Sequence, residues 1–390
     1  MKKLSVLFCC ALCVFALVGS LNAETHYSVI DLGTLGGTYS SARRINNVGP
    51  VAGCSNTEGD SGQLGFVWEN NMMTPLPSLG GTNSIAKNIN DSGQVVGESD
   101  VEGDSARHAV IWEPDEEGIY NTVEDLHVKY EDPDPNNDED PWGRNSNAND
   151  INESGVIVGN ARCEFGGNAY VIGQNGDIAY FPASEWGGGG GAAVNDSDSP
   201  LVVGYSRTDV NEVRWGFVCG VEIVDGTPQP RDMLDIGTLG GQVTRAMDVN
   251  NSGQVVGAAY LDGDLVRHAY LWEDGTMTDL GTLGGTNSTA RGIDDLGQVV
   301  GHSDVSGDSV VHAILWKSGF PLYDLNDLID DPAWELRTVC DINDLGQIVG
   351  EGFIDGETHG FLLNPVPIPA AVWLLGSGLI GLVAIRRRPV

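Results

Sequence analysis

The stretch VTRAMDVNNSGQVVG, residues 243–257, decides the fold of this chain. A strand-like segment ends at Val249-Asn250, a tight turn follows, and a second strand-like run ends at Gly257. Asn tolerates turn geometry, and Gly253 supplies the positive φ that such a turn requires. The β-branched residues Val255 and Val256 favour an extended strand after the turn. The stretch therefore predicts a β-hairpin.

Seven copies of this pattern fill the chain, each with an apolar anchor, an Asn or Asp, a turn, and an apolar run that ends in Gly. The copies are residues 45–53, 89–97, 151–159, 194–204, 249–257, 293–301 and 342–350. Successive copies start 44, 62, 43, 55, 44 and 49 residues apart. A period of this size with strand-like content is typical of a propeller or another β-array.

The clearest unit, residues 243–285, predicts four short strands. Two further strands are expected at His268–Trp272 and Thr276–Leu280, after turns at 262–264 and 273–275. Small residues recur three places before six of the anchors: Ala42, Ala86, Ala148, Gly191, Ala246 and Ala290. In every third strand a small residue precedes a large one, which is Phe66, Val110, Tyr170, Phe217, Tyr270, Ile314 or Phe361. We expect neighbouring units to press together at these positions, because a single unit cannot bury both of its faces.

The two ends of the repeat region complement each other. The last unit stops after its third strand, His359–Leu363, and the chain begins with a spare fourth strand, His26–Leu32. The residues that follow this spare strand, Gly33–Gly37, match Gly281–Gly285. Pairing of the spare strand with the last unit would leave few open sheet edges. The sequence therefore predicts an all-β fold, a seven-bladed propeller of four-stranded blades closed by the N-terminal strand, in preference to an open solenoid.

The charge balance excludes one class of partner. The chain has 55 acidic and 20 basic residues, a net charge of −35. Five of the basic residues lie in the two terminal segments, so the remainder carries 15 minus 55, or −40. A surface of this kind repels nucleic acid and anionic lipid, and it suits cations or neutral polymers.

The chain divides into three parts: a signal peptide at 1–23, the repeats at 24–363, and a C-terminal segment at 364–390. Lys2-Lys3 forms a basic start, Leu4–Val18 an apolar run, and Ala23 precedes the expected cleavage point. Cys54, Cys163, Cys219 and Cys340 remain after this segment. Export permits disulfides between Cys54 and Cys340 and between Cys163 and Cys219, and four buried free thiols are the alternative.

The C-terminal segment combines a proline linker, an apolar stretch and a basic end. Pro365, Pro367 and Pro369 precede the apolar run Ala370–Ile385, which would span roughly 24 Å as a helix. Arg386, Arg387 and Arg388 follow and predict a cytoplasmic end. Residues 366–374, from Val366-Pro367-Ile368-Pro369 onward, resemble the Val-Pro-x-Pro-Ala variant of the PEP-CTERM sorting signal of Gram-negative bacteria. The resemblance implies membrane insertion before processing by an exosortase-type protease, in an envelope rich in exopolysaccharide. A permanent single-span anchor is the alternative.

The third strands resemble the HAF family of extracellular repeats. The triplets that carry the resemblance are His108-Ala109-Val110, His268-Ala269-Tyr270, His312-Ala313-Ile314 and His359-Gly360-Phe361, whereas Leu64, Asn168 and Trp215 replace the His elsewhere. The family implies export and repetition, and it implies no established reaction.

Several residue clusters could act as sites. The four histidines sit one per unit, so we expect local hydrogen bonds at the strand starts in preference to a shared metal ion. The acidic loops 100–104, 262–264 and 304–308 are expected to be solvated hairpins, with weak calcium binding as the alternative. We expect the insertion Tyr130–Trp142 to be disordered, and among the loops it is the best candidate for binding calcium or a partner. Gly33–Gly37 lacks the Lys-Ser/Thr of a phosphate loop, and Gly187–Gly191 is interpreted as a flexible connector.

These observations favour an exported, envelope-associated, non-catalytic protein that binds an extracellular polymer, such as exopolysaccharide, or an envelope protein. No catalytic residue and no cofactor are assigned. The alternative is a polysaccharide-processing enzyme that uses carboxylates in the propeller channel, since a pair of carboxylates is the usual machinery of glycoside hydrolysis.

Overall fold

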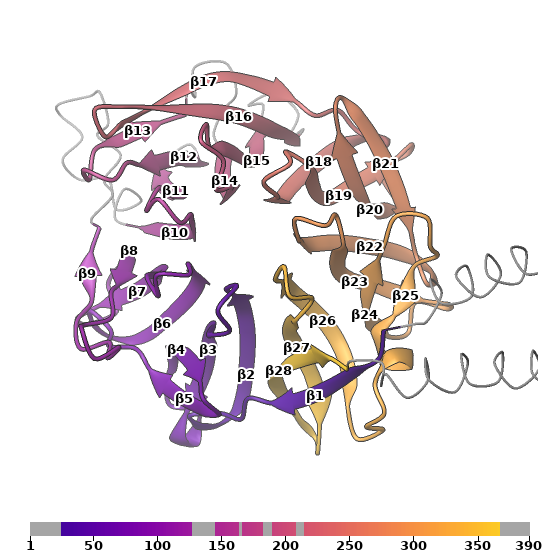
Figure 1. The fold of residues 1–390 in the computed structure, drawn as a ribbon, viewed down its shortest axis with the longest axis horizontal. Coiled ribbons are helices and arrows are strands. Elements are labelled where there is room, and N and C mark those ends of the chain that lie inside the picture. The colour runs from indigo at the N-terminus through magenta and orange to yellow at the C-terminus, as the bar shows by residue number, and fades with distance from the viewer. Residues whose placement is uncertain (1–24, 127–144, 164–165, 182–188, 208–213, 367–390) are drawn as a thin grey trace, which may run out of the picture.

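The computed structural model describes residues 25–126, 145–163, 166–181, 189–207 and 214–366, and they form an all-β structure (Figure 1). The leader at 1–23, the sorting residues from Pro367 onward and the insertion Tyr130–Trp142 lie outside the described residues. Helical turns in the described part are limited to two short 3-10 segments, η1 (Glu58–Asp60) and η2 (Leu325–Leu328). None of the described segments is a helix long and apolar enough to cross a membrane.

The strands form seven repeats of four, each named by its order in the chain. Repeat 1 holds β2 (Gly36–Ile45), β3 (Val51–Thr57), β4 (Gln63–Glu69) and β5 (Met72–Pro75). Repeat 2 holds β6 (Gly80–Ile89), β7 (Val95–Val101), β8 (Arg107–Trp112) and β9 (Glu124–Asp125). Repeat 3 holds β10 (Ser146–Ile151), β11 (Ile157–Cys163), β12 (Gly166–Ile172) and β13 (Ile178–Tyr180). Repeat 4 holds β14 (Gly189–Val194), β15 (Leu201–Arg207), β16 (Arg214–Val224) and β17 (Thr227–Asp235).

The remaining three repeats follow the same order. Repeat 5 holds β18 (Gly240–Val249), β19 (Val255–Leu261), β20 (Arg267–Glu273) and β21 (Thr276–Gly281). Repeat 6 holds β22 (Gly284–Ile293), β23 (Val299–Val305), β24 (Val311–Trp316) and β25 (Tyr323–Asp324). Repeat 7 holds β26 (Glu335–Ile342), β27 (Ile348–Ile354), β28 (Glu357–Pro365) and the N-terminal strand β1 (Tyr27–Asp31).

The strands are antiparallel within each repeat, and single parallel bridges join some repeats into larger sheets. The bridges are Tyr39 with Thr358, Gln63 with Asn83, and Arg214 with Val243. They give four sheets of 12, 8, 4 and 4 strands: repeats 7, 1 and 2, then repeats 4 and 5, with repeats 3 and 6 alone. The seven repeats surround a common centre, with the first strand of each innermost (Figure 1). Each first strand contacts the first strand of the next repeat, and β26 contacts β2.

The N-terminal strand pairs with the last repeat, as its sequence predicted. β1 runs antiparallel to β28, from Tyr27 opposite Pro365 to Asp31 opposite Phe361. Tyr27 is 3% exposed and packs in a core cluster with Trp334 and Leu363. A segment more than 300 residues away in sequence therefore supplies the fourth strand of repeat 7.

Small residues bring neighbouring repeats into close contact, which confirms the expected packing. A Cβ atom on Gly65 of β4 would lie 2.9 Å from the backbone nitrogen of Ala86 in β6. The same contact joins Gly360 of β28 to Ala42 of β2, again at 2.9 Å. All seven large residues that follow these small positions in the third strands are at most 3% exposed. Burial of these side chains is the main stabilising term between repeats.

Gly189, Gly190 and Gly191 correct one expectation, because they are the first residues of β14 and not part of a flexible connector. A Cβ atom on Gly190 would lie 2.7 Å from the side-chain oxygen of Asn160 and 2.8 Å from the ring of Tyr205. Glycine is required there by a close approach between repeats 3 and 4.

Candidate functional site

Each first strand ends in a turn that the residue after the anchor holds in shape. In repeat 5 the Asn250 Oδ1 atom accepts hydrogen bonds from the backbone N–H groups of Ser252 and Gln254, at 3.1 and 3.0 Å. In repeat 6 the Asp294 Oδ1 atom accepts the equivalent bonds from Leu296 and Gln298. Asx turns of this kind explain why Asn or Asp recurs at this place in the sequence.

The side-chain amides of the same residues link neighbouring repeats in a chain that we call the amide belt. Six of them donate from Nδ2 to the backbone carbonyl of the equivalent residue in the next repeat, at 2.9–3.2 Å. The donors are Asn46, Asn90, Asn152, Asn195, Asn250 and Asn343. Asp294 stands at the seventh position and has no amide to donate, so the belt has one gap, between repeats 6 and 7.

The next residue of each turn forms a second circle, which we call the rim. Each rim backbone N–H donates to the side-chain oxygen of the rim residue in the following repeat, at 2.6–3.0 Å. The rim residues in order are Asn47, Asp91, Glu153, Asp196, Asn251, Asp295 and Asp344. The last bond, from Asp344 to Asn47, returns the circle to its start.

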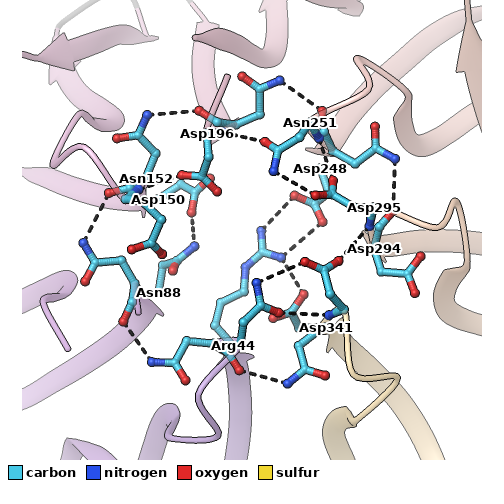
Figure 2. Close-up of a pocket in the computed structure, with 18 of the residues that line it drawn as sticks. Arg44, Asn88, Asp150, Asn152, Asp196, Asp248, Asn251, Asp294, Asp295 and Asp341 are labelled. Atoms are coloured by element: carbon cyan, nitrogen blue, oxygen red, sulfur yellow. Dashed lines mark hydrogen bonds and ion pairs between the residues drawn. The ribbon is translucent and has the colours of Figure 1, made fainter. Parts of the chain in front are cut away.

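A cavity opens inside these circles (Figure 2). It encloses about 700 Å³ of empty space, part of it open to solvent. Its lining holds nine carboxyl groups and a single basic residue, Arg44. Partial burial raises the pKa of Glu153 and of Asp196 on the rim. The cavity is therefore a strongly acidic opening whose carboxylates are held in place by backbone donors.

A β-bulge in every first strand places one residue of each repeat just below the rim. The pairing of first and second strands shifts by one residue there, for example between Ala246 and Asp248. The residues after the shift form what we call the bulge layer: Arg44, Asn88, Asp150, Ala193, Asp248, Gly292 and Asp341. Bulges commonly redirect side chains next to functional sites. Unlike the rim, this layer has a different set of chemical groups in successive repeats.

Arg44 lies at the centre of the bulge layer and pairs with two carboxylates from other repeats (Figure 2). Its guanidinium is 3.2 Å from each Asp248 oxygen and 2.8 Å from Asp341 Oδ1. Burial alone would lower the pKa of Arg44, but Asp248, Asp341 and Asp150 hold it above its ordinary value. The side chains of Arg44, Asp248 and Asp341 are at most 15% exposed, so this is a buried ion-pair cluster.

The bulge-layer carboxylates also hold neighbouring repeats together. Asp150, Asp248 and Asp341 accept the anchor N–H of the following repeat, which belongs to Val194, Ile293 and Ile45, at 2.7–3.0 Å. Asp150 also accepts a hydrogen bond from the Asn88 amide. Burial, opposed by Arg44, raises the pKa of Asp150 to about 8, and burial likewise raises the pKa of Asp341 to about 6. Burial therefore favours the protonated form of Asp150.

The four repeated histidines lie outside the cavity lining and make the local hydrogen bonds that we expected. Each Nδ1 atom lies 2.6–3.0 Å from an Asp carboxylate on the fourth strand of its own repeat. The pairs are His108 with Asp125, His268 with Asp279, His312 with Asp324, and His359 with Asp31. Leu64 and Asn168 replace the His in repeats 1 and 3. In these repeats Pro75 and Tyr180 occupy the fourth-strand position that holds the Asp in the His-containing repeats. The histidines thus pair with the fourth strand of each repeat and do not line the cavity.

The acidic hairpin loops clamp the start of a first strand. Asp104 accepts hydrogen bonds from both the backbone N–H and the hydroxyl of Thr82, and Asp308 does the same with Thr286. These bonds hold the pKa of Asp104 and of Asp308 below the usual range. Across the described ranges, no group of three or more His, Cys, Asp or Glu is arranged to hold a metal ion. In these hairpins the carboxylates of Asp104 and Asp308 serve as hydrogen-bond acceptors for Thr82 and Thr286.

Cys54 and Cys340 are free thiols in this structure, so the free-thiol alternative holds for this pair. Burial raises the pKa of both thiols, and the neighbouring Arg43 partly offsets this effect at Cys54. The Cys219 Sγ atom lies 3.1 Å from the Arg231 carbonyl oxygen. The sulfur of Cys163 is outside the described side chains.

Sequence reasoning did not identify the bulge layer. The residue before the anchor differs from repeat to repeat, so no motif marks it. The one available signal was a charged residue directly before an apolar anchor, as in Arg44-Ile45 and Asp150-Ile151. No model of a known protein family matches the chain, and no curated protein is significantly similar to it.

Proposed function

We propose that residues 27–365 form a closed seven-bladed β-propeller, each repeat being one blade. The rim bond from Asp344 to Asn47 and the close contact of Gly360 with Ala42 support closure between repeats 7 and 1. The fourth strand β1 covers the edge that β28 would otherwise expose.

We further propose that the protein is exported, envelope-associated and non-catalytic, and binds an extracellular polymer or a protein partner. The proposed binding site is the acidic opening of the cavity with its rim, which we call the mouth. The cavity with its nine carboxyl groups is the observation that carries this proposal. The rim carboxylates are preorganised by backbone donors, which lowers the cost of ordering them when a ligand binds. The central position of the cavity also fits a binding site, because a concave opening buries more of the ligand's surface than a flat one.

The non-catalytic proposal rests on the bulge-layer carboxylates. Asp248 and Asp341 are paired with Arg44. Asp150, Asp248 and Asp341 each accept the anchor N–H of a neighbouring repeat. Groups held in this way stabilise the ring and are poorly placed to act as nucleophile or base.

Export and sorting are proposed from the terminal segments and their resemblance to HAF repeats and the PEP-CTERM signal. The described chain ends at Val366, beside the first turn of repeat 7, where a Cβ atom on Gly346 would lie 4.0 Å from the Pro365 ring. The segment with Pro367, Pro369 and Arg386–Arg388 lies outside the described residues. An exosortase-type protease is the proposed partner for this segment.

One observation favours the alternative, a polysaccharide-processing enzyme. Burial raises the pKa of Asp150 to about 8, and Asp248 is paired with Arg44 close by. Two carboxyl groups in such different environments are typical of a glycosidase acid–base pair. Asp150→Asn would abolish such activity.

The test measures binding of host exopolysaccharide and of purified envelope proteins to the full chain and to a mouth variant, Asp91→Asn with Asp295→Asn and Asp344→Asn. Asn already serves the rim at positions 47 and 251, so this variant keeps the hydrogen-bond circle. The matched control is Glu58→Gln with Glu102→Gln and Asp262→Asn, at exposed hairpins on the opposite ends of the second strands.

Loss of binding in the mouth variant alone supports the proposal. Binding that both variants retain places the site elsewhere and contradicts it. Shortening of the polysaccharide that Asp150→Asn abolishes establishes the enzyme instead.

A further inference from the structure

Three neighbouring repeats expose apolar side chains at the tips of their rim turns. Val48, Leu296 and Leu345 are 66%, 76% and 62% exposed. The equivalent position in the other four repeats is a serine: Ser92, Ser154, Ser197 or Ser252. We call the three apolar residues the apolar arc. Large apolar side chains that gather on an exposed surface commonly mark a binding site.

The three residues of the apolar arc lie on consecutive repeats, next to the rim residues. The rim bonds run from Asp295 to Asp344 and from Asp344 to Asn47, so repeats 6, 7 and 1 follow one another around the mouth. Each arc residue comes directly after a rim residue in sequence. The mouth therefore combines an apolar segment with exposed, ionisable carboxyl groups within one surface.

The lining chemistry discriminates between ligand classes. Nine carboxyl groups repel an acidic polysaccharide, and the single arginine of the lining is already paired with Asp248 and Asp341. The described lining residues include no aromatic side chain on which a sugar ring could stack. Complementary charge and apolar contact are instead both supplied by a basic polypeptide.

We propose that the mouth docks a basic polypeptide segment that also carries apolar side chains. This inference rests on the proposed function as a mouth-binding protein and specifies its partner. Lysine or arginine side chains of the segment pair with the rim carboxylates, and its apolar side chains cover the apolar arc. Exposed ion pairs contribute little by themselves and are screened by salt, so the apolar contact decides affinity and the charges decide orientation.

The experiment measures the affinity of the full chain, in non-ionic detergent, for two labelled peptides of equal length and charge, one alternating Lys and Leu and the other alternating Lys and Ser. The first should bind roughly tenfold more tightly, since it alone buries apolar surface on the arc. Val48→Ser with Leu296→Ser and Leu345→Ser should abolish this difference, because it gives these turns the serine of the other repeats. Leu265→Ser is the control, an 84% exposed residue on a hairpin at the opposite end of β19.

The outcomes separate this inference from the proposed function. Equal binding of the two peptides that the mouth variant (Asp91→Asn with Asp295→Asn and Asp344→Asn) weakens overturns the apolar partner and leaves a mouth that binds cations. Both proposals are overturned if no tested ligand, whether peptide, exopolysaccharide or envelope protein, binds the full chain more tightly than the mouth variant.

Other occupants would give different results. A doubled mass in solution that the three serines abolish assigns the arc to a second copy of the chain. Exopolysaccharide that displaces the Lys-Leu peptide assigns the mouth to a polymer. Peptide binding by a chain that ends at Val366 but not by the full chain assigns it to the C-terminal segment. Each of these results overturns the basic-peptide proposal.

Discussion

The rim and the bulge layer lie three residues apart in every repeat, the rim in the turn and the bulge layer on the first strand, and they follow opposite rules. Every rim residue is Asn, Asp or Glu, and each performs the same task of accepting one N–H from the preceding repeat. The bulge layer holds Arg, Asn, Asp, Ala and Gly at equivalent positions. A ring of repeats needs one repeated contact to close, whereas a central cluster needs groups that differ so that they complement each other.

This contrast follows from geometry. Rim residues contact only their neighbours, so a single interaction can be copied seven times without conflict. Bulge-layer residues converge on one centre, where seven copies of any charged group would repel each other in a poorly solvated space. Arg44 facing Asp248 and Asp341 resolves this conflict. A Cβ atom on Gly292 would lie 3.0 Å from the Asp341 Cα atom, so a small residue there leaves room for the cluster.

The largest effect is expected from deletion of His26–Leu32, which asks whether either layer persists without closure. The deletion removes β1 and exposes the β28 edge together with the pocket of Tyr27, which is 3% exposed. We expect aggregation and a less cooperative thermal transition, because an open edge and apolar surface become accessible. Light scattering and calorimetry provide the measurement. A deleted chain that stays monomeric with an unchanged melting temperature would refute the closed ring.

A large loss is also expected when the bulge layer loses its cation. Arg44→Met leaves Asp248 and Asp341 buried without a counter-charge, which should cost about 3–5 kcal/mol of unfolding free energy at pH 7. Adding Asp248→Asn and Asp341→Asn to the same chain should recover most of it. Urea denaturation measures both variants. A loss below about 1 kcal/mol for Arg44→Met would mean that the cluster is hydrated and weakly coupled.

Asp150→Asn tests the protonation of the same layer. The folded pKa of about 8 lies above the unfolded value near 3.8, so the folded chain binds the extra proton between these pH values. Stability then falls as pH rises through this window, by about 1.4 kcal/mol per pH unit, or roughly 2.7 kcal/mol from pH 5 to pH 7.

The substitution should remove this part of the slope. The Asn side-chain oxygen can still accept from the Val194 N–H, whereas the Asn88 amide loses its acceptor unless it flips. Denaturation at pH 5 and pH 7 measures the slope, with exposed Asp262→Asn as the control. An unchanged slope in Asp150→Asn would show that this carboxyl is ionised in the folded chain.

The two layers also explain how far the sequence could predict the molecule. Contacts that recur in successive repeats could be predicted from the sequence. They include the Asn-containing turns and the close packing at small residues such as Ala42 and Gly65. The pairing of the two chain ends could be predicted because their sequences complement each other. The histidine hydrogen bonds could be expected for the same reason. The pairing partner of each His required the register of the fourth strand, which short segments such as Glu124–Asp125 do not reveal.

The central cluster could not be predicted because its members have no shared pattern. Arg44 and Asp248 are 204 residues apart and occupy a position that is Gly292 or Ala193 elsewhere. The bulge that directs them inward is a property of strand pairing and has no signature within a single repeat. The apolar arc was missed for another reason, because one exposed Val or Leu in a turn is unremarkable until three neighbouring repeats share it.

The smallest effect is a gain, expected from Asp294→Asn. Six repeats donate an amide to the next carbonyl, and the Asn343 carbonyl lacks this donor because Asp294 precedes it in the belt. Completing the belt should stabilise the fold by about 0.5–1.5 kcal/mol, the usual net value of one buried hydrogen bond.

Burial also raises the pKa of Asp294, so the folded chain holds that proton more tightly and stability falls as pH rises. The gain from Asn should therefore be larger at pH 7 than at pH 4. The reverse substitution, Asn250→Asp, should cost a similar amount, and two melting temperatures equal to the parent would show that the belt positions the turns without stabilising them.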